Sequence, residues 1–359
     1  MNADNIVLAL NYKEGESLFA EPLRRTPFLI PGLLPCGTHL LCGAPKAGKS
    51  WLALWLAIQL TNGAPVWDTP TEPCGVLYLC LEDTENRVKE RLHKIADSVS
   101  RNLHVAVQCH TMAEGLVEQL ENYLRMTPDT KLVIIDTLQK IRGENTDSSM
   151  YRADYTDISA IKALGDRLGV TFLLVHHLRK MPDTDDPFNM ISGSNGLSGA
   201  VDGMYLLYKD KRTENTARFL MTGRDIESQE YKLRFKSCKW ELVEKNGEKE
   251  DAEEPVPPVL ESVERFMQGK EIWVGTATEL CALLDVSVSP TVITRHLSRY
   301  AETWLHDHRL GYETARDSKR RYLGLYTYSD PDENGEQHPK VETPLFTANA
   351  VFKEDLSFA

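Results

Sequence analysis

The sequence has no stretch of about 18 consecutive apolar residues, the length that a helix needs to cross a lipid bilayer. Its N-terminal segment, MNADNIVLALNYKEGESL, also lacks the basic start and the long apolar run of a secretory signal. From these two absences we expect a cytoplasmic protein with no membrane partner.

A cysteine pattern is missing as well. The seven cysteines are scattered, and none of them forms a C-x-x-C pair or a cluster with the spacing of metal ligands. Cys42, Cys74 and Cys80 lie in or beside apolar runs that are typical of strands. This distribution indicates buried, reduced thiols and gives no support to a disulfide framework or a zinc site.

Basic residues are in the minority: 41 Lys and Arg stand against 53 Asp and Glu, which gives a net charge of −12. This balance excludes a protein that coats nucleic acid or anionic membrane with its whole surface, but it leaves room for a local basic site. The composition, with 42% hydrophobic and 26% charged residues, is that of a globular protein. A length of 359 residues allows one large domain or two ordinary ones.

Apolar runs alternate with helix-like segments from about residue 28 to residue 245. Strands are predicted at 75–81, 132–135, 170–175, 201–208, 216–222 and 231–235, and helices at 50–60, 84–98 and 154–168. Continuous apolar strands between helices predict an α/β fold with a mostly parallel sheet covered on both faces.

The composition changes at residues 244–258, EKNGEKEDAEEPVPP, which are acidic and contain three prolines. Such a segment is typical of a linker. We therefore expect a first domain at 1–245, a linker at 246–258, a small second domain at 259–328 and a polar tail at 329–359.

Residues 43–50, GAPKAGKS, match the phosphate-binding pattern G-x-x-x-x-G-K-[ST] in full, after an apolar strand and before a helix. The glycines let backbone N–H groups turn toward phosphate oxygens, and the start of the helix adds its dipole. We expect Lys49 to reach the β- and γ-phosphates of ATP and the Ser50 hydroxyl to bind Mg²⁺. The expected nucleotide-binding residues are Gly43, Ala44, Pro45, Lys46, Ala47, Gly48, Lys49, Ser50 and Trp51.

Carboxylates follow two of the predicted strands. Asp136 ends the apolar run 132–135, and the carboxyl ends of parallel strands face the crevice where ligands bind, so we expect Asp136 to hold the Mg²⁺. Glu82 ends the run 75–81 in the same way and is the expected base for an attacking water. Asp83 is the alternative base, and a helix N-cap is its alternative role.

Taken in order, five segments resemble the RecA-like hexameric ATPases, and among them the plasmid replication helicase RepA and related ATPases of phages and mobile elements. The segments are GAPKAGKS, VLYLCLED, LVIIDTLQK, FLLVHHLRK and GSNGLSGAVDG. The resemblance covers residues 25–245. It implies a RecA-like P-loop core, ATP and Mg²⁺ as cofactors, and a homo-oligomeric, hexameric ring.

The same resemblance implies roles for single residues. Glu82 falls where the family has its catalytic glutamate, and His176 and His177 fall where it has a polar sensor of the γ-phosphate. Arg224 falls where the family sends an arginine finger into the ATP of the neighbouring subunit, where its charge stabilises the transferring phosphoryl group.

Two long segments, 142–155 and 179–199, correspond to the family's DNA loops in the central channel. The second loop offers Arg179 and Lys180 to single-stranded DNA. Its three aspartates, at positions 183, 185 and 186, oppose strong binding there.

Three predicted helices, at 259–267, 277–284 and 290–305, are followed by a strand–turn–strand, which is the order of a winged helix-turn-helix. The run WVGTATEL also resembles the winged-helix domains of phage primases and mobile-element ATPases. Residues 262–325 hold nine basic and eight acidic residues (+1), which leaves −13 for the rest of the chain. The expected contacts to duplex DNA are Arg295, Arg299, Lys319, Arg320 and Arg321. A winged helix used only for protein contacts is the alternative.

The sequence thus predicts an ATP-hydrolysing, ring-forming motor that associates with DNA, resembles replicative helicases, and acts in replication or maintenance of a plasmid, phage or mobile element. An ATP-switched DNA-binding regulatory protein without unwinding activity is the alternative, and the acidic second loop favours it. A small-molecule P-loop kinase is a third hypothesis, which the two histidines and the winged helix weaken.

Overall fold

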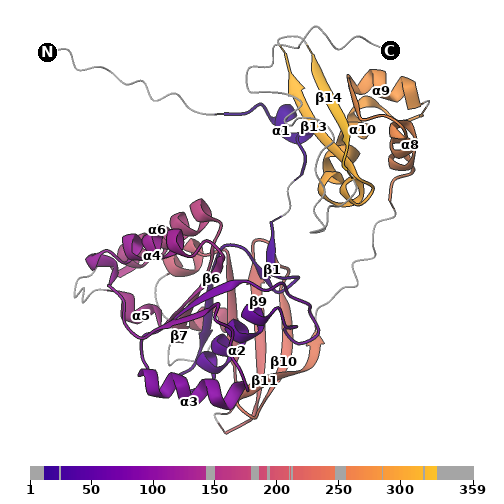
Figure 1. The fold of residues 1–359 in the computed structure, drawn as a ribbon. Helices are drawn as coiled ribbons and strands as arrows, with labels where there is room; N and C mark the ends of the chain where they lie inside the picture. The colour runs from indigo at the N-terminus through magenta and orange to yellow at the C-terminus, as the bar shows by residue number, and fades with distance from the viewer. Residues whose placement is uncertain are drawn as a thin grey trace, which may run out of the picture. The chain divides into compact units, whose positions relative to one another are not determined.

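The computed structural model describes residues 12–23, 26–142, 150–178, 186–191, 195–209, 211, 213–246, 256–284, 286–317 and 320–329 (Figure 1). The chain forms two compact units. The larger runs from Thr26 to Asp251, and the smaller joins the N-terminal segment, up to Arg25, to the chain from Ala252 onward. Among the described helices, none is long and apolar enough to cross a membrane.

A nine-stranded sheet forms the larger unit, in the order β11-β10-β9-β8-β3-β7-β6-β4-β5. The strands from β8 to β5 in this order are parallel, and β9, β10 and β11 continue the sheet as antiparallel neighbours. The expected α/β fold with a mostly parallel sheet is therefore confirmed. The strands are β3 (Thr38–Gly43), β4 (Gly75–Cys80), β5 (Leu103–Ala106), β6 (Thr130–Asp136), β7 (Thr171–His177), β8 (Gly203–Tyr208), β9 (Thr216–Gly223), β10 (Gln229–Lys236) and β11 (Lys239–Asn246).

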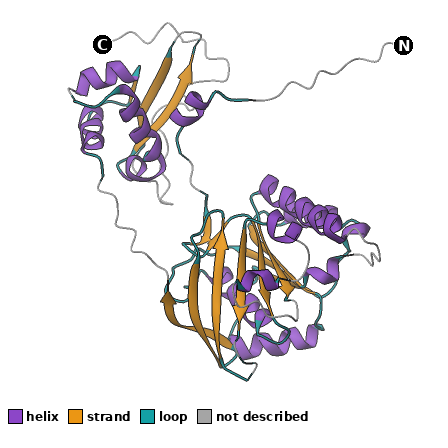
Figure 2. Ribbon diagram, turned by 180° about the vertical axis from the view of Figure 1, so that it is seen from behind, coloured by secondary structure: helices purple, strands orange, loops and turns teal. Residues whose placement is uncertain are grey.

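Helices cover both faces of this sheet (Figure 2). Side chains alternate along a strand, so Leu41 of β3 packs with the core that contains α2, and Leu40 packs with the core that contains α4 and α6. This double burial explains the continuous apolar runs in the sequence. The helices are α2 (Lys49–Asn62), α3 (Glu85–Ile95), α4 (Leu116–Met126), α5 (Leu138–Ile141), α6 (Met150–Leu168) and α7 (Asn195–Ala200), with short 3₁₀ turns at Met112–Glu114 and Pro187–Met190.

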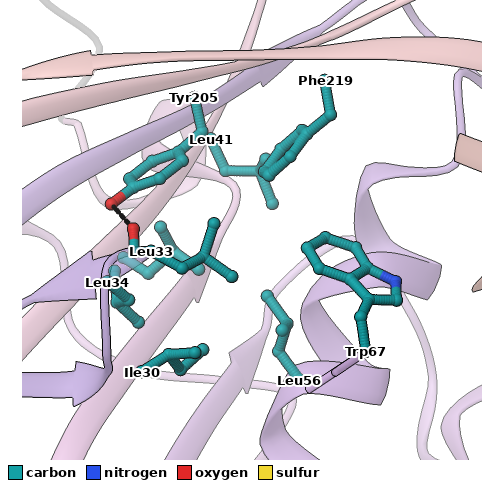
Figure 3. Close-up of a pocket in the computed structure, with 9 residues that line it drawn as sticks. Ile30, Leu33, Leu34, Leu41, Leu56, Trp67, Tyr205 and Phe219 are labelled. Atoms are coloured by element: carbon teal, nitrogen blue, oxygen red, sulfur yellow. Dashed lines mark hydrogen bonds between the residues drawn. The ribbon is translucent and has the colours of Figure 1, made fainter. Parts of the chain in front are cut away.

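A short hairpin of β1 (Phe28–Ile30) and β2 (Leu34–Pro35) closes a small apolar pocket in this core (Figure 3). Ile30, Leu33 and Leu34 face Trp67 and Tyr205 across it, and the Tyr205 hydroxyl donates a hydrogen bond to the Leu33 carbonyl at 2.6 Å. Because that hydroxyl is already bonded and the other lining groups are apolar, the pocket is a packing gap rather than a ligand site.

The smaller unit contains the three expected helices and the expected ribbon. They are α8 (Pro258–Met267), α9 (Ala277–Leu284), α10 (Pro290–Arg299), β13 (Leu310–Arg316) and β14 (Arg321–Thr327). The third helix is shorter than expected, because the regular helix ends at Arg299 and a π-helical turn, Ala301–Leu305, follows it. An additional strand, β12 (Ile272–Gly275), pairs with β14 and completes an antiparallel sheet in the order β12-β14-β13.

Residues 12–23, which we expected in the first domain, lie on the smaller unit instead. They include a short helix, α1 (Gly15–Ala20). The Tyr312 hydroxyl of β13 donates to the carbonyl of Ala20 at 2.9 Å, and the Leu23 N–H donates to the carbonyl of Ser298 at 2.9 Å. The smaller unit is therefore assembled from both ends of the chain. Local sequence could not indicate this, since the partners are nearly 300 residues apart.

Candidate nucleotide-binding site

The phosphate-binding loop has the geometry that its sequence predicts. β3 ends at Gly43 and α2 begins at Lys49, with Gly48 at a φ of 106° directly before the helix. A Cβ at Gly48 would lie 2.9 Å from the Trp240 ring, so both the conformation and the close packing require glycine. The first N–H groups of α2 therefore face the loop opening as an anion site.

Lys49 lies within this loop. Its ammonium donates to the carbonyls of Gly43 and Ala44, at 2.8 and 3.2 Å, and lies 3.4 Å from Nδ1 of His177. Burial lowers the pKa of Lys49, and the Asp136 carboxylate opposes this effect. A largely buried ammonium held by neutral carbonyls is positioned to bind phosphate oxygens, which carry the opposing charge.

Ser50 and Asp136 meet at the end of the sheet. Asp136 is the last residue of β6, is almost completely buried, and accepts a hydrogen bond from the Tyr78 hydroxyl at 2.8 Å. Burial raises the pKa of Asp136, while the hydrogen bonds from the Ser50 and Tyr78 hydroxyls and the charge of Lys49 oppose the rise.

A hydroxyl and a carboxylate are oxygen donors that suit Mg²⁺. Within the described residues no group of three His, Cys, Asp or Glu could hold a metal by protein ligands alone. The Ser50–Asp136 pair therefore fits a Mg²⁺ that is held mainly by phosphate and water.

Glu82 and Asp83 have different surroundings although they are neighbours. The Glu82 carboxylate is 46% exposed, accepts a hydrogen bond from the Thr137 hydroxyl at 3.1 Å, and lies 3.8 Å from Nε2 of His177. Asp83 is only 7% exposed and is bound by two arginines of α3, Arg87 at 3.0 Å and Arg91 at 2.6 Å. The carboxylate available to a water molecule in the cleft is that of Glu82. The helix cap is also not Asp83, because Thr84 caps α3.

The two histidines at the end of β7 are also separated by their positions. His177 lines the cleft with Lys49, whereas His176 is buried beside Cys42 of β3 and does not line it. Alternation along the strand accounts for the difference. Of the two expected sensors, only His177 lies at the nucleotide site.

Arg224 lies at the end of the sheet where the parallel strands begin, opposite the end that carries the phosphate-binding loop of its own chain. Its backbone N–H donates to the Asp202 carbonyl, and the Asp202 N–H donates to that of Thr38, where β3 begins. β3 then runs five residues to Gly43, about 16 Å at about 3.3 Å per residue. The guanidinium lies 3.5 Å from the Asp202 carboxylate and is 63% exposed, so it faces solvent rather than its own P-loop.

Several cleft residues were not expected from the sequence. Thr137, Arg87 and Arg91 line the cleft, and the Arg91 guanidinium lies 5.4 Å from the Trp51 ring centre. The spacing of the two arginines, four apart on the helix after Glu82, was a signal that could have indicated them. The full lining is Lys46, Gly48, Lys49, Ser50, Trp51, Cys80, Glu82, Asp83, Arg87, Arg91, Asp136, Thr137 and His177.

The hairpin of β10 and β11 contacts the phosphate-binding loop, and the sequence did not predict this contact. Trp240 of β11 donates its indole N–H to the Gly48 carbonyl at 3.1 Å, and its own carbonyl accepts from the Trp67 indole at 2.8 Å. These two bonds hold the loop glycine against the end of the sheet.

The residues expected to bind DNA fall partly outside the described residues. Arg179, Lys180 and Lys319 lie outside them, as do 143–149 of the first expected channel loop and 179–185 and 192–194 of the second. In the smaller unit, Arg295, Arg299 and Arg320 are exposed, whereas Arg321 lies 3.4 Å from Glu16 of α1.

All the cleft residues lie within a segment that matches a known protein family. Residues 11–183 match the family model described as "AAA domain". Two solved structures are similar. The first is described as an ATPase domain and has 16% sequence identity, a TM-score of 0.46, and coverage of 58% of this chain and 85% of that chain. The second, a DnaB-like replicative helicase described with its interactions with primase, has 16% identity, a TM-score of 0.47, and coverage of 58% and 57%. The chain thus matches a little over half the length of the second.

The match to the AAA domain model includes the P-loop, Glu82, Asp136 and His177. It supports a nucleotide-binding P-loop ATPase core in the larger unit.

Proposed function

We propose that the protein hydrolyses ATP in the cleft at the carboxyl ends of β3, β4, β6 and β7. The observation that carries the proposal is the convergence of Lys49, the Ser50–Asp136 pair and the exposed Glu82 carboxylate in one cleft. Backbone N–H groups of the loop and Lys49 bind the phosphates. Ser50 and Asp136 would hold Mg²⁺, which would supply positive charge to neutralise part of the phosphate charge.

Glu82 is the residue we propose as general base. It accepts a proton from the attacking water, and the water oxygen displaces ADP from the γ-phosphorus. The Thr137 hydroxyl orients the carboxylate through its 3.1 Å hydrogen bond. Asp83 does not compete for this role, because its charge is neutralised by two arginines of α3. His177 lies between Lys49 and Glu82 and is the proposed sensor of the γ-phosphate.

We further propose that the site is completed by a second copy of the chain. An exposed Arg224 at the far edge of the sheet cannot serve its own cleft, but it can serve the cleft of a neighbour in a head-to-tail ring. A hexamer is the proposed state, and the resemblance of the sequence to RepA-type ATPases favours it.

The proposed role of this ring is that of a DNA-associated, helicase-like motor in the replication or maintenance of a plasmid, phage or mobile element. Single-stranded DNA would contact Arg179 and Lys180. The smaller unit, as a winged helix, would contact duplex DNA through Arg295, Arg299, Lys319, Arg320 and Arg321. The three aspartates of the second loop favour the alternative, an ATP-switched DNA-binding regulator that does not unwind DNA.

The test is ATP hydrolysis by the purified chain with and without single-stranded DNA, together with its mass with and without nucleotide. We expect hydrolysis that DNA stimulates and a ring-sized mass with ATP. Strand displacement on a forked duplex separates the motor from the regulator. A protein that binds no ATP would overturn the proposal as a whole.

A further inference from the structure

α1 brings carboxylates to the basic side of the smaller unit. Glu14 forms an ion pair with Arg316 at the end of β13, and Glu16 lies 3.4 Å from Arg321 at the start of β14. Arg321 also donates to the Ser17 hydroxyl at 3.3 Å. Two arginines of the β13–β14 ribbon are thus matched by acidic residues from the other end of the chain.

The segment that carries these carboxylates is docked by its backbone. The Ser298 hydroxyl of α10 donates to the Glu21 carbonyl, the Ser298 carbonyl accepts from the Leu23 N–H at 2.9 Å, and Ala20 is fully buried. Tyr312 of β13 adds its bond to Ala20. α1 lies beside β13 and α10 (Figure 1).

The paired arginines belong to a larger set, the basic face, which we define as Arg295 and Arg299 of α10 with Arg316, Arg320 and Arg321 of the ribbon; all of them except Arg321 are exposed. Arg295 and Arg299 line a groove whose other wall is formed by α1 and the residues after it. A nucleic-acid backbone that contacts both α10 and the ribbon would have to occupy the space that α1 and the residues after it now fill.

The ion pairs contribute little to folding. Glu14 and Glu16 are 59% and 77% exposed, whereas Arg316 is 43% and Arg321 only 17% exposed, and ion pairs whose carboxylates face solvent in this way stabilise a fold only weakly. Their carboxylates occupy positions at which phosphate groups would neutralise the same guanidinium groups.

We propose that the basic face is a nucleic-acid-binding surface that the N-terminal segment masks in part, at Arg316 and Arg321, and that nucleic acid binds it by displacing Glu14 and Glu16 from these two arginines. The proposal rests on the DNA association proposed above. It adds Arg316 to the contacts and gives the N-terminal segment the role of an intramolecular competitor.

The experiment uses the full chain and a fluorescent duplex DNA, with binding followed by fluorescence anisotropy at low salt. The double variant Glu14→Gln/Glu16→Gln removes the competing charges and keeps the backbone contacts of α1. We expect its affinity to rise about two- to thirtyfold, the range that two such ion pairs supply. The gain should shrink as salt is added, since both the ion pairs and the phosphate contacts are screened.

A matched control is Glu118→Gln/Glu244→Gln, which changes the net charge equally at exposed positions of the larger unit. We expect its affinity to stay near that of the parent chain. A second arm adds Arg316→Gln and Arg321→Gln to the Glu14→Gln/Glu16→Gln chain, and we expect the gain to disappear.

Equal gains in the control and in the Glu14/Glu16 variant would mean that net charge, and not masking, sets the affinity, and would overturn this inference. So would DNA binding that the Glu14/Glu16 variant leaves unchanged. Hydrogen exchange provides a second readout, because displaced residues 14–23 should exchange faster with duplex present. If no variant binds DNA while ATP hydrolysis is intact, the DNA association itself fails, and this inference fails with it.

Discussion

The different surroundings of Glu82 and Asp83 lead to a prediction with opposite outcomes for the two residues. Glu82→Gln keeps the shape of the side chain and leaves an amide oxygen that still accepts the Thr137 hydrogen bond. It removes the only function that we assign to the carboxylate, which is to accept a proton. Loss of a general base costs about 10²–10⁴-fold in turnover, or about 3–5 kcal/mol of transition-state stabilisation.

Asp83→Asn is the matched control, one position along the chain. Asp83 is nearly buried and bound by Arg87 and Arg91, so its change leaves two guanidinium groups without their carboxylate. The expected effect is a loss of stability of about 1–3 kcal/mol, seen as a lower melting temperature, with turnover falling much less than in Glu82→Gln.

The assay is steady-state phosphate release, with nucleotide affinity measured separately by titration. We expect Glu82→Gln to bind ATP at least as well as the parent chain and to hydrolyse it slowly, whereas Asp83→Asn binds and hydrolyses but melts earlier. The reasoning would be refuted by the reverse: parental turnover in Glu82→Gln, or a folded Asp83→Asn that binds ATP and cannot hydrolyse it.

Three further predictions follow from the cleft and the units. Lys49→Ala should abolish tight ATP binding, because the phosphates lose their main cationic contact; wild-type affinity in a titration would contradict the assignment. Arg224→Ala should bind ATP nearly normally but lose about 10³–10⁵-fold in turnover. Mixing it with Lys49→Ala should restore part of the activity. If the mixed chains co-assemble and stay inactive, Arg224 is not an arginine finger. Deleting residues 1–23 should lower the melting temperature of the smaller unit and leave ATP binding unchanged, because the buried Tyr312 hydroxyl loses its acceptor on Ala20 at a cost of about 1–3 kcal/mol. Scanning calorimetry, with Tyr312→Phe as the control, measures this change. An unchanged transition would show that α1 contributes no stability.

The central strands could be predicted from the sequence because burial on both faces leaves an uninterrupted apolar run, as in Leu132–Ile135. The edge strands could not be predicted in the same way. β5 and β11 each have a neighbour on one side only, and their sequences, LHVA and KWELVEKN, mix polar and apolar residues. An edge strand is specified by pairing with distant residues, which a local pattern does not record.

The candidate site shows the same division. The loop and Asp136 could be predicted, because each depends on its position at the end of one strand. The contrast between Glu82 and Asp83 was not predicted, although the spacing of Arg87 and Arg91 after Asp83 was a local signal for the two arginines of α3 that bind only this one of the two carboxylates. The docking of α1 depends on contacts with Ser298 and Tyr312, for which no short-range pattern exists.

The direction of the strands explains why a single chain is expected to hydrolyse ATP poorly. Lys49, Glu82 and Asp136 follow or end parallel strands, so they lie together where these strands end. β9 runs antiparallel to its neighbour β8, so Arg224, which follows β9, lies at the opposite end, where the parallel strands begin. These two ends are about 16 Å apart along β3, and no rotation of an arginine side chain spans that distance. If Arg224 contributes to hydrolysis at all, the cleft that it serves belongs to another copy of the chain, and activity per chain must then rise with protein concentration.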